Sequence, residues 1–176
     1  MSFVDKVSET DAGPELKPLY DQIREHHGFL PNYFQALGHA PQVVKAHLDL
    51  SSLLAREGAL PAPLKEQIVL VVSGINSSSY CVAAHMEVLR RLGVEKALGR
   101  KLATDYASAP VGTKEMALFR FADKLTRNQS EIEETDADAV FQAGWEKAAL
   151  IETVLTVAWA NFINRVSFGL GLFADF

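Results

Sequence analysis

Cysteine is nearly absent from this chain, which has a single one, Cys81, among 176 residues. A lone cysteine cannot close a disulfide within the chain, so no disulfide framework supports the fold. Basic clusters are absent as well, because 17 Lys and Arg residues are scattered among 22 Asp and Glu, for a formal net charge of −5. Phosphate backbones are bound by concentrated positive charge, so we expect no nucleic-acid partner.

Long uninterrupted apolar runs are also missing. The most apolar late segment, residues 148–173, contains a Glu, two Asn and an Arg, which would be costly in lipid. We therefore expect a buried helix there and no membrane span. The acidic start, MSFVD, lacks the basic segment and apolar run of a secretory signal. Together with the single cysteine, this favours a cytoplasmic location.

Strand-like alternation is essentially absent, whereas helical spacing of apolar residues recurs along the chain. Breaks rich in Gly, Pro, Asn and Ser separate the periodic segments and predict about eight helices. The loops are short, and no long linker or repeat divides the chain. We therefore predict an all-α fold in one domain over residues 1–176, with residues 1–60 as a helical N-terminal extension on a core of residues 61–176.

Two boundaries are predicted near the C-terminus. Thr135 followed by Asp138 resembles a capping box and predicts the start of a short helix. Gly144 separates it from a long helix that we expect to run from Trp145 into the region of Gly169.

The single cysteine stands where a thiol becomes reactive. Cys81 follows three serines, which readily cap a helix N-terminus, and His85 comes one helical turn later. The unpaired N–H groups of a first helical turn stabilise a thiolate, and a nearby imidazole can take the thiol proton. The run from Ser77 to His85 therefore favours redox or nucleophilic chemistry.

A carboxylate is expected to join this pair. Residues 63–75 and 80–92 are predicted to form two helices of a hairpin, and folding back at Asn76 and Ser77 brings Glu66 within about one turn of His85. Glu66 could then orient His85, which could in turn deprotonate Cys81. The alternative is structural: Cys81 and His85 would belong to the apolar stripe of a buried helix, and Glu66 would be solvated.

The other polar residues are weaker candidates. Tyr80 could donate a hydrogen bond to a substrate oxygen, although an aromatic residue at a helix start more often packs. Asn161, Asn164 and Arg165 share a helix face, where they could line a pocket or fix a subunit contact, and a structural role is favoured. The remaining histidines are expected at the surface or in packing roles; they are His26, His27, His39 and His47.

Metal and nucleotide cofactors find little support in the sequence. Cys81 and His85 supply two ligands and Glu66 at most a third, which leaves a catalytic zinc site without support. No glycine-rich phosphate loop is present. We therefore expect no cofactor.

The spacing of these residues resembles a known signature. Glu66, eleven residues, Ser78, two residues, Cys81, three residues and His85 are similar to the alkylhydroperoxidase AhpD pattern, in which a first cysteine stands where this chain has serine. The scaffold of that family is shared with carboxymuconolactone decarboxylases. The segments HGFLPN at 27–32 and NFINR at 161–165 resemble the peroxidase-related branch of the superfamily.

The resemblance implies an all-helical fold, a hydroperoxide substrate and an attacking role for Cys81. Ser78 cannot resolve a sulfenic acid as a disulfide, so an external thiol or the Cys81 of another subunit would have to do so. The family commonly forms homo-oligomers, and a content of 48% hydrophobic residues points the same way.

Three functions therefore remain open. The first is a peroxidase-like antioxidant enzyme that reduces hydrogen peroxide or alkyl hydroperoxides through Cys81, with Glu66 and His85 as a proton relay. The second is a non-redox, decarboxylase-like enzyme that uses the same Glu66 and His85 on a small carboxylated molecule. The third is a catalytically degenerate oligomeric binding protein.

Overall fold

The computed structural model describes residues 2–175, which contain nine α-helices, two short 3₁₀ helices and no strand. The predicted all-α class is therefore confirmed. The α-helices are α1 Lys17–His27, α2 Asn32–Leu37, α3 Pro41–Ala55, α4 Ala62–Ile75, α5 Ser79–Arg91, α6 Lys96–Asp105, α7 Thr113–Arg127, α8 Glu134–Gln142 and α9 Lys147–Gly169. The 3₁₀ helices are η1 Tyr106–Ser108 and η2 Gln129–Glu131.

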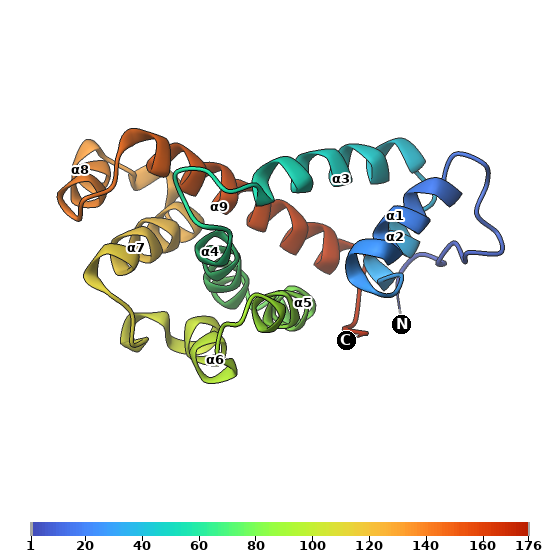
Figure 1. The fold of residues 1–176 in the computed structure, drawn as a ribbon, viewed down its shortest axis with the longest axis horizontal. Helices are drawn as coiled ribbons and strands as arrows, with labels where there is room; N and C mark the ends of the chain where they lie inside the picture. The colour runs from blue at the N-terminus through green and yellow to red at the C-terminus, as the bar shows by residue number, and fades with distance from the viewer. Residues whose placement is uncertain (1, 176) are drawn as a thin grey trace.

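Helix α4 is the centre of the core, and α5, α6, α7 and α9 all pack against it (Figure 1). Six consecutive residues of α4, 68–73, are buried, so the helix is covered on every side rather than along one stripe. A helix that is apolar nearly all round is stable only in such surroundings. The elements that flank the candidate site are thus fixed to the best-buried part of the molecule.

Helices α1, α2 and α3 gather at one end of the molecule, and α9 extends from α8 at the other end towards them, with α3 alongside it (Figure 1). The two chain ends also meet here, because the Phe3 N–H donates to the Leu170 carbonyl at 3.0 Å. The Asn32 N–H donates to the Asp175 carboxylate at 2.7 Å. The division into a 1–60 extension and a 61–176 core stays a prediction.

A buried ion pair ties the α3–α4 loop to α9. Lys65 is 7% exposed, and its Nζ lies 2.9 Å from a carboxylate oxygen of Glu152. The same ammonium donates to the Leu54 and Arg56 carbonyls, while Glu152 accepts the N–H groups of residues 59 and 60. Every polar atom of the pair thus has partners, as a buried charge requires.

The helix boundaries near the C-terminus agree with those predicted from the sequence, with one correction. The long helix is present as α9. The capping box of α8, however, joins Glu133 and Asp136 rather than Thr135 and Asp138. Within residues 2–175 we find no helix that combines the length and apolarity needed to cross a membrane.

Candidate active site

The predicted helical hairpin is formed by α4 and α5. Its turn contains Ser77 in the left-handed region, with φ of 56°, and the Ser78 N–H donates to the Ser73 carbonyl at 2.9 Å. Helix α5 begins directly afterwards, so Cys81 is its third residue. The thiol therefore lies in the first turn, where unpaired backbone N–H groups favour negative charge.

The hairpin brings Glu66 and His85 together as expected. Glu66 Oε2 lies 2.7 Å from His85 Nδ1, and the two side chains are only 20% and 16% exposed. A carboxylate can only accept, so Nδ1 carries the proton in this contact. Nε2 of a neutral His85 is then an acceptor and can take a proton from a reacting group.

The Cys81 thiol makes a contact that the sequence did not indicate. Cys81 is 3% exposed, and its Sγ lies 3.4 Å from the Ser167 hydroxyl on α9 rather than in a hydrogen bond with His85. Ser167 donates its own proton to the Ile163 carbonyl at 2.8 Å. The hydroxyl is therefore placed to accept from the thiol.

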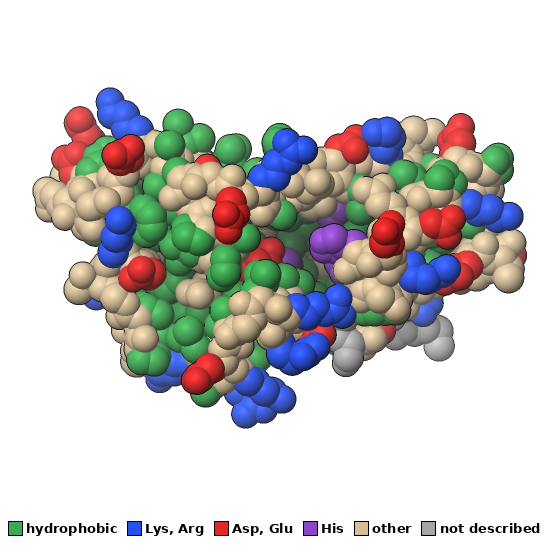
Figure 2. Space-filling model, in the orientation of Figure 1, with side chains coloured by type: hydrophobic (Ala, Val, Ile, Leu, Met, Phe, Trp, Pro, Cys, Tyr) green, Lys and Arg blue, Asp and Glu red, His purple; other side chains and the backbone are tan. Residues whose placement is uncertain are grey.

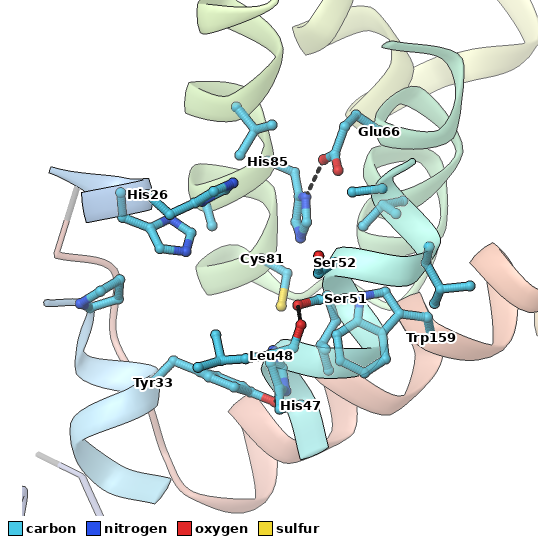
Figure 3. A pocket seen from close by; sticks show the side chains of 18 of the residues that line it. His26, Tyr33, His47, Leu48, Ser51, Ser52, Glu66, Cys81, His85 and Trp159 are labelled. Atoms are coloured by element: carbon cyan, nitrogen blue, oxygen red, sulfur yellow. Dashed lines mark hydrogen bonds and ion pairs between the residues drawn. The ribbon is translucent and has the colours of Figure 1, made fainter. Parts of the chain in front are cut away.

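One large pocket is lined by Glu66, Cys81 and His85. Its volume is about 720 Å³, and it lies between the α4–α5 hairpin, α9 and the N-terminal helices. Figure 2 shows the molecule hollowed at this place, with histidine side chains beside the opening. Figure 3 shows Glu66 and His85 on one side of Cys81 and Tyr33 and His47 on the other. The Glu66–His85 pair and the Cys81 thiol thus face the same pocket.

Aromatic rings form much of the far wall. The His47 ring lies 4.5 Å from the ring of Trp159 and 5.1 Å from those of Tyr33 and Phe34. Burial lowers the pKa of His47 to about 4, with a smaller contribution from the charge of His27. His47 is therefore neutral near pH 7.

Three of the four histidines assigned to surface or packing roles line the pocket. They are His26, His27 and His47. Burial also lowers the pKa of His27 to about 4, and the neighbouring His26 adds to the effect. His39 lies elsewhere, with Nε2 2.8 Å from the Asp5 carbonyl. The sequence did not indicate that these three residues share a pocket, because spacing along the chain carries no signal of a pocket assembled from separate helices.

The remaining candidates have other partners. Tyr80 lines the pocket, but its hydroxyl accepts the Tyr33 N–H at 3.2 Å, and burial and the Asp175 carboxylate raise its pKa. Ser78 is buried immediately before α5 and makes no side-chain cap.

The asparagines of α9 serve packing. The Asn76 amide donates to Asn161 and Asn164, at 3.0 and 2.8 Å, and Arg165 donates to Asn161. This amide network joins the end of α4 to α9, in accordance with the favoured structural role. Among the described residues, no group of three His, Cys, Asp or Glu side chains could hold a metal.

The protein is thus all-helical and holds a thiol, an imidazole and a carboxylate in one pocket. Residues 41–124 match the model of the carboxymuconolactone decarboxylase family. No curated protein matches the chain. The matched segment contains Glu66, Cys81 and His85, in accordance with the resemblance seen in the sequence.

The whole fold is similar to solved AhpD-like structures. A peroxidase-related protein from Ralstonia eutropha JMP134, described as an alkylhydroperoxidase AhpD core, is 23% identical with a TM-score of 0.91. A peroxidase-related protein from Silicibacter sp. TM1040 is 26% identical with the same TM-score. A variant of the debrominase Bmp8 in complex with 2,3,4-tribromopyrrole is 21% identical with a TM-score of 0.85. Each comparison covers 99% of this chain and 92% of the other.

Proposed function

We propose that this chain is a peroxidase-like oxidoreductase that reduces organic hydroperoxides through the single thiol of Cys81. The observation that carries the proposal is the shared pocket of Cys81 and the Glu66–His85 pair. A nucleophile, a base within one helical turn and a carboxylate that orients the base are the parts that thiol catalysis needs. The similarity to peroxidase-related proteins supports the same class.

The first step forms the thiolate. His85 Nε2 takes the Cys81 proton, while Nδ1 remains bonded to Glu66, whose negative charge stabilises the imidazolium. The thiolate sulfur then attacks the terminal oxygen of the hydroperoxide. An S–O bond forms, the O–O bond breaks, the sulfur loses two electrons and the remaining oxygen leaves as an alcohol after protonation.

The second step restores the thiol with an external thiol reductant. One reductant molecule attacks the Cys81 sulfenic acid, releases water and leaves a mixed disulfide, which a second reductant molecule reduces. The 3% exposure of Cys81 favours a small reductant that enters the pocket. It disfavours the Cys81 of another subunit, which is equally buried.

The size of the pocket supports an organic substrate over hydrogen peroxide. A volume of about 720 Å³ falls within the range of cavities that enclose drug-sized molecules, and its far wall is aromatic. Hydrogen peroxide would leave most of this surface without a partner. We therefore expect bulky hydroperoxides, such as cumene hydroperoxide, to react faster than hydrogen peroxide.

Mass spectrometry after treatment with cumene hydroperoxide and dimedone tests the proposal. We expect one dimedone adduct, located on Cys81. The Glu66→Gln and His85→Ala variants should form it at least about tenfold more slowly, because general-base catalysis contributes about 10²- to 10⁴-fold. Tyr106→Phe, a change outside the lining of this pocket, should label at the wild-type rate. Absence of any adduct would refute peroxide chemistry.

A second candidate is reductive dehalogenation of an aromatic compound. The aromatic wall around His47 and Trp159 suits a planar ring, and a debrominase shares the fold. Bromide release from 2,3,4-tribromopyrrole, supplied with a thiol, measures this activity. Activity on a carboxylated substrate that survives Cys81→Ser would instead favour the decarboxylase-like alternative.

A further inference from the structure

Two side chains that the thiol relay does not use face Cys81 from the N-terminal helices. Tyr33 stands on α2 and His47 on α3, and the Tyr33 hydroxyl lies 3.4 Å from His47 Nδ1. Both line the pocket that contains Cys81 and His85. Figure 3 shows this pair across the thiol from Glu66 and His85. A substrate on Cys81 would therefore lie between two polar pairs.

Packing holds the Tyr33–His47 pair in place. Tyr33 is 5% exposed, and its ring contacts Phe34 edge-on at 5.4 Å and stacks on Tyr80 at 6.3 Å. The His47 ring is held between Trp159, at 4.5 Å, and Phe34. Side chains fixed in this way lose little freedom when a substrate binds, which suits a catalytic group.

Both groups keep one protonation state near pH 7. Burial raises the pKa of Tyr33, and the nearby Cys81 raises it further, so the phenol retains its proton. Burial lowers the pKa of His47 to about 4, so this imidazole stays neutral. The pair therefore offers a phenol O–H and one imidazole N–H to the pocket.

We infer that Tyr33 is the catalytic acid that protonates the leaving alkoxide, and that His47 is a positioning residue for its hydroxyl. The inference rests on the proposed hydroperoxide reduction. It assigns a catalytic role to Tyr33, which lies outside residues 41–124, the segment that matches the family model.

The proton balance requires such a donor. In the proposed first step the proton of Cys81 has passed to His85 before the thiolate attacks, and Figure 3 shows His85 on the opposite side of Cys81 from Tyr33. The oxygen that leaves carries negative charge on the other side of the broken O–O bond. Tyr33 gives it a proton and becomes a phenolate, and His47 Nδ1–H donates to that phenolate. The proton on His85 then returns to Tyr33 through water, so that no net proton is consumed.

Leaving-group dependence distinguishes an acid from a packing residue. An alkyl hydroperoxide releases a strongly basic alkoxide, which needs protonation, whereas peracetic acid releases acetate, which does not. In Tyr33→Phe we expect oxidation of Cys81 by cumene hydroperoxide to slow at least about tenfold, and oxidation by peracetic acid to change less than about twofold. Stopped-flow rates at saturating and limiting peroxide separate kcat from KM, and the loss should fall on kcat.

Variants of His47 test its role through the ratio of two rates, the oxidation of Cys81 by cumene hydroperoxide and its oxidation by peracetic acid. His47→Leu should reproduce part of the selective loss, while His47→Asn, whose amide nitrogen can replace Nδ1 as a donor, should restore it. In the Tyr33→Phe background neither change should alter the ratio further. Tyr106→Phe, whose hydroxyl bonds to Asp123 on α7, is the matched control and should behave like the wild type.

Failure of the inference and failure of the proposed function give different results. If wild-type Cys81 reacts with neither peroxide, the proposed function is wrong. If the wild type reacts with both, and Tyr33→Phe slows both equally or neither, Tyr33 is not the acid and the inference is overturned.

Discussion

At the scale of single residues, burial lowers the pKa of two pocket histidines, His27 and His47. His47 was expected to be a packing or surface residue because it has no cysteine or carboxylate partner at ligand spacing in the sequence. Its position depends on α3 lying beside α9, a long-range contact that local spacing does not reveal. Glu66 and His85, by contrast, were predicted to meet because one short hairpin joins them.

The neutral state of His47 makes stability depend on pH. Its folded pKa of about 4 lies below the ordinary value of 6.5, so the unfolded chain binds a proton more readily. This contribution is complete above about pH 6.5 and is lost as the pH falls towards 4. Through His47 alone, lowering the pH from 7 to 5 should reduce the free energy of unfolding by up to about 2 kcal/mol.

Urea unfolding of the wild type and of His47→Phe at both pH values measures this effect. The aromatic variant should lose the contribution of His47, while the pH dependence due to His27, whose pKa burial also lowers to about 4, should remain. His39→Phe, at the exposed contact with Asp5, is the control and should retain the contribution of His47. An equal pH dependence in the wild type and His47→Phe would show that His47 is not held neutral by burial.

At the scale of elements, the start of α5 determines whether a sulfenic acid on Cys81 can be resolved as a disulfide. The sequence predicted the α4–α5 hairpin correctly, because breaks rich in Pro and Ser bracket two segments in which apolar residues recur with helical spacing. Local signals misplaced the α8 capping box by two residues, because Thr135–Asp138 fits the Ser/Thr-x-x-Asp/Glu pattern, whereas the observed box begins with Glu133 and does not. The Ser167 contact of Cys81 could not be predicted, because α9 is remote in sequence.

Ser78→Cys should convert this helix start into a dithiol site. The Val82 N–H bonds to the Ser78 carbonyl at 2.8 Å, so residues 78 and 81 are separated by one helical turn. We expect peroxide to close a 78–81 disulfide and a dithiol reductant to support faster turnover. Ser79→Cys is the control, because residues 79 and 81 point to different helix faces. A reduced 78–81 pair after peroxide treatment would mean that the turn cannot support the AhpD pattern.

At the scale of the whole molecule, an apolar stripe remains on the surface of α9. Ile151, Leu155 and Phe162 are 59%, 49% and 46% exposed and follow helical spacing. Adjacent apolar residues of this kind commonly meet another subunit. The hydrophobic content and the long C-terminal helix with Trp159, Phe162 and Phe168 suggested an oligomer, and the fold adds which face of α9 is exposed.

We expect light scattering to give a multiple of 19.3 kDa at micromolar concentration. Leu155→Glu should shift the mass towards the monomer, because a buried unpaired carboxylate destabilises an interface. Phe173→Glu, in the exposed tail after α9, should leave the mass unchanged. A wild-type monomer would contradict the prediction.

The central claim is that Cys81 reduces an organic hydroperoxide by two electrons with the help of Glu66 and His85. The most direct measurement is a single turnover without reductant, in which reduced protein is mixed with one equivalent of cumene hydroperoxide and the cumyl alcohol is quantified. We predict one alcohol per protein chain, none in Cys81→Ser, and slower formation of the same amount in Glu66→Gln. Alcohol formation that is absent, or that persists in Cys81→Ser, would contradict the account.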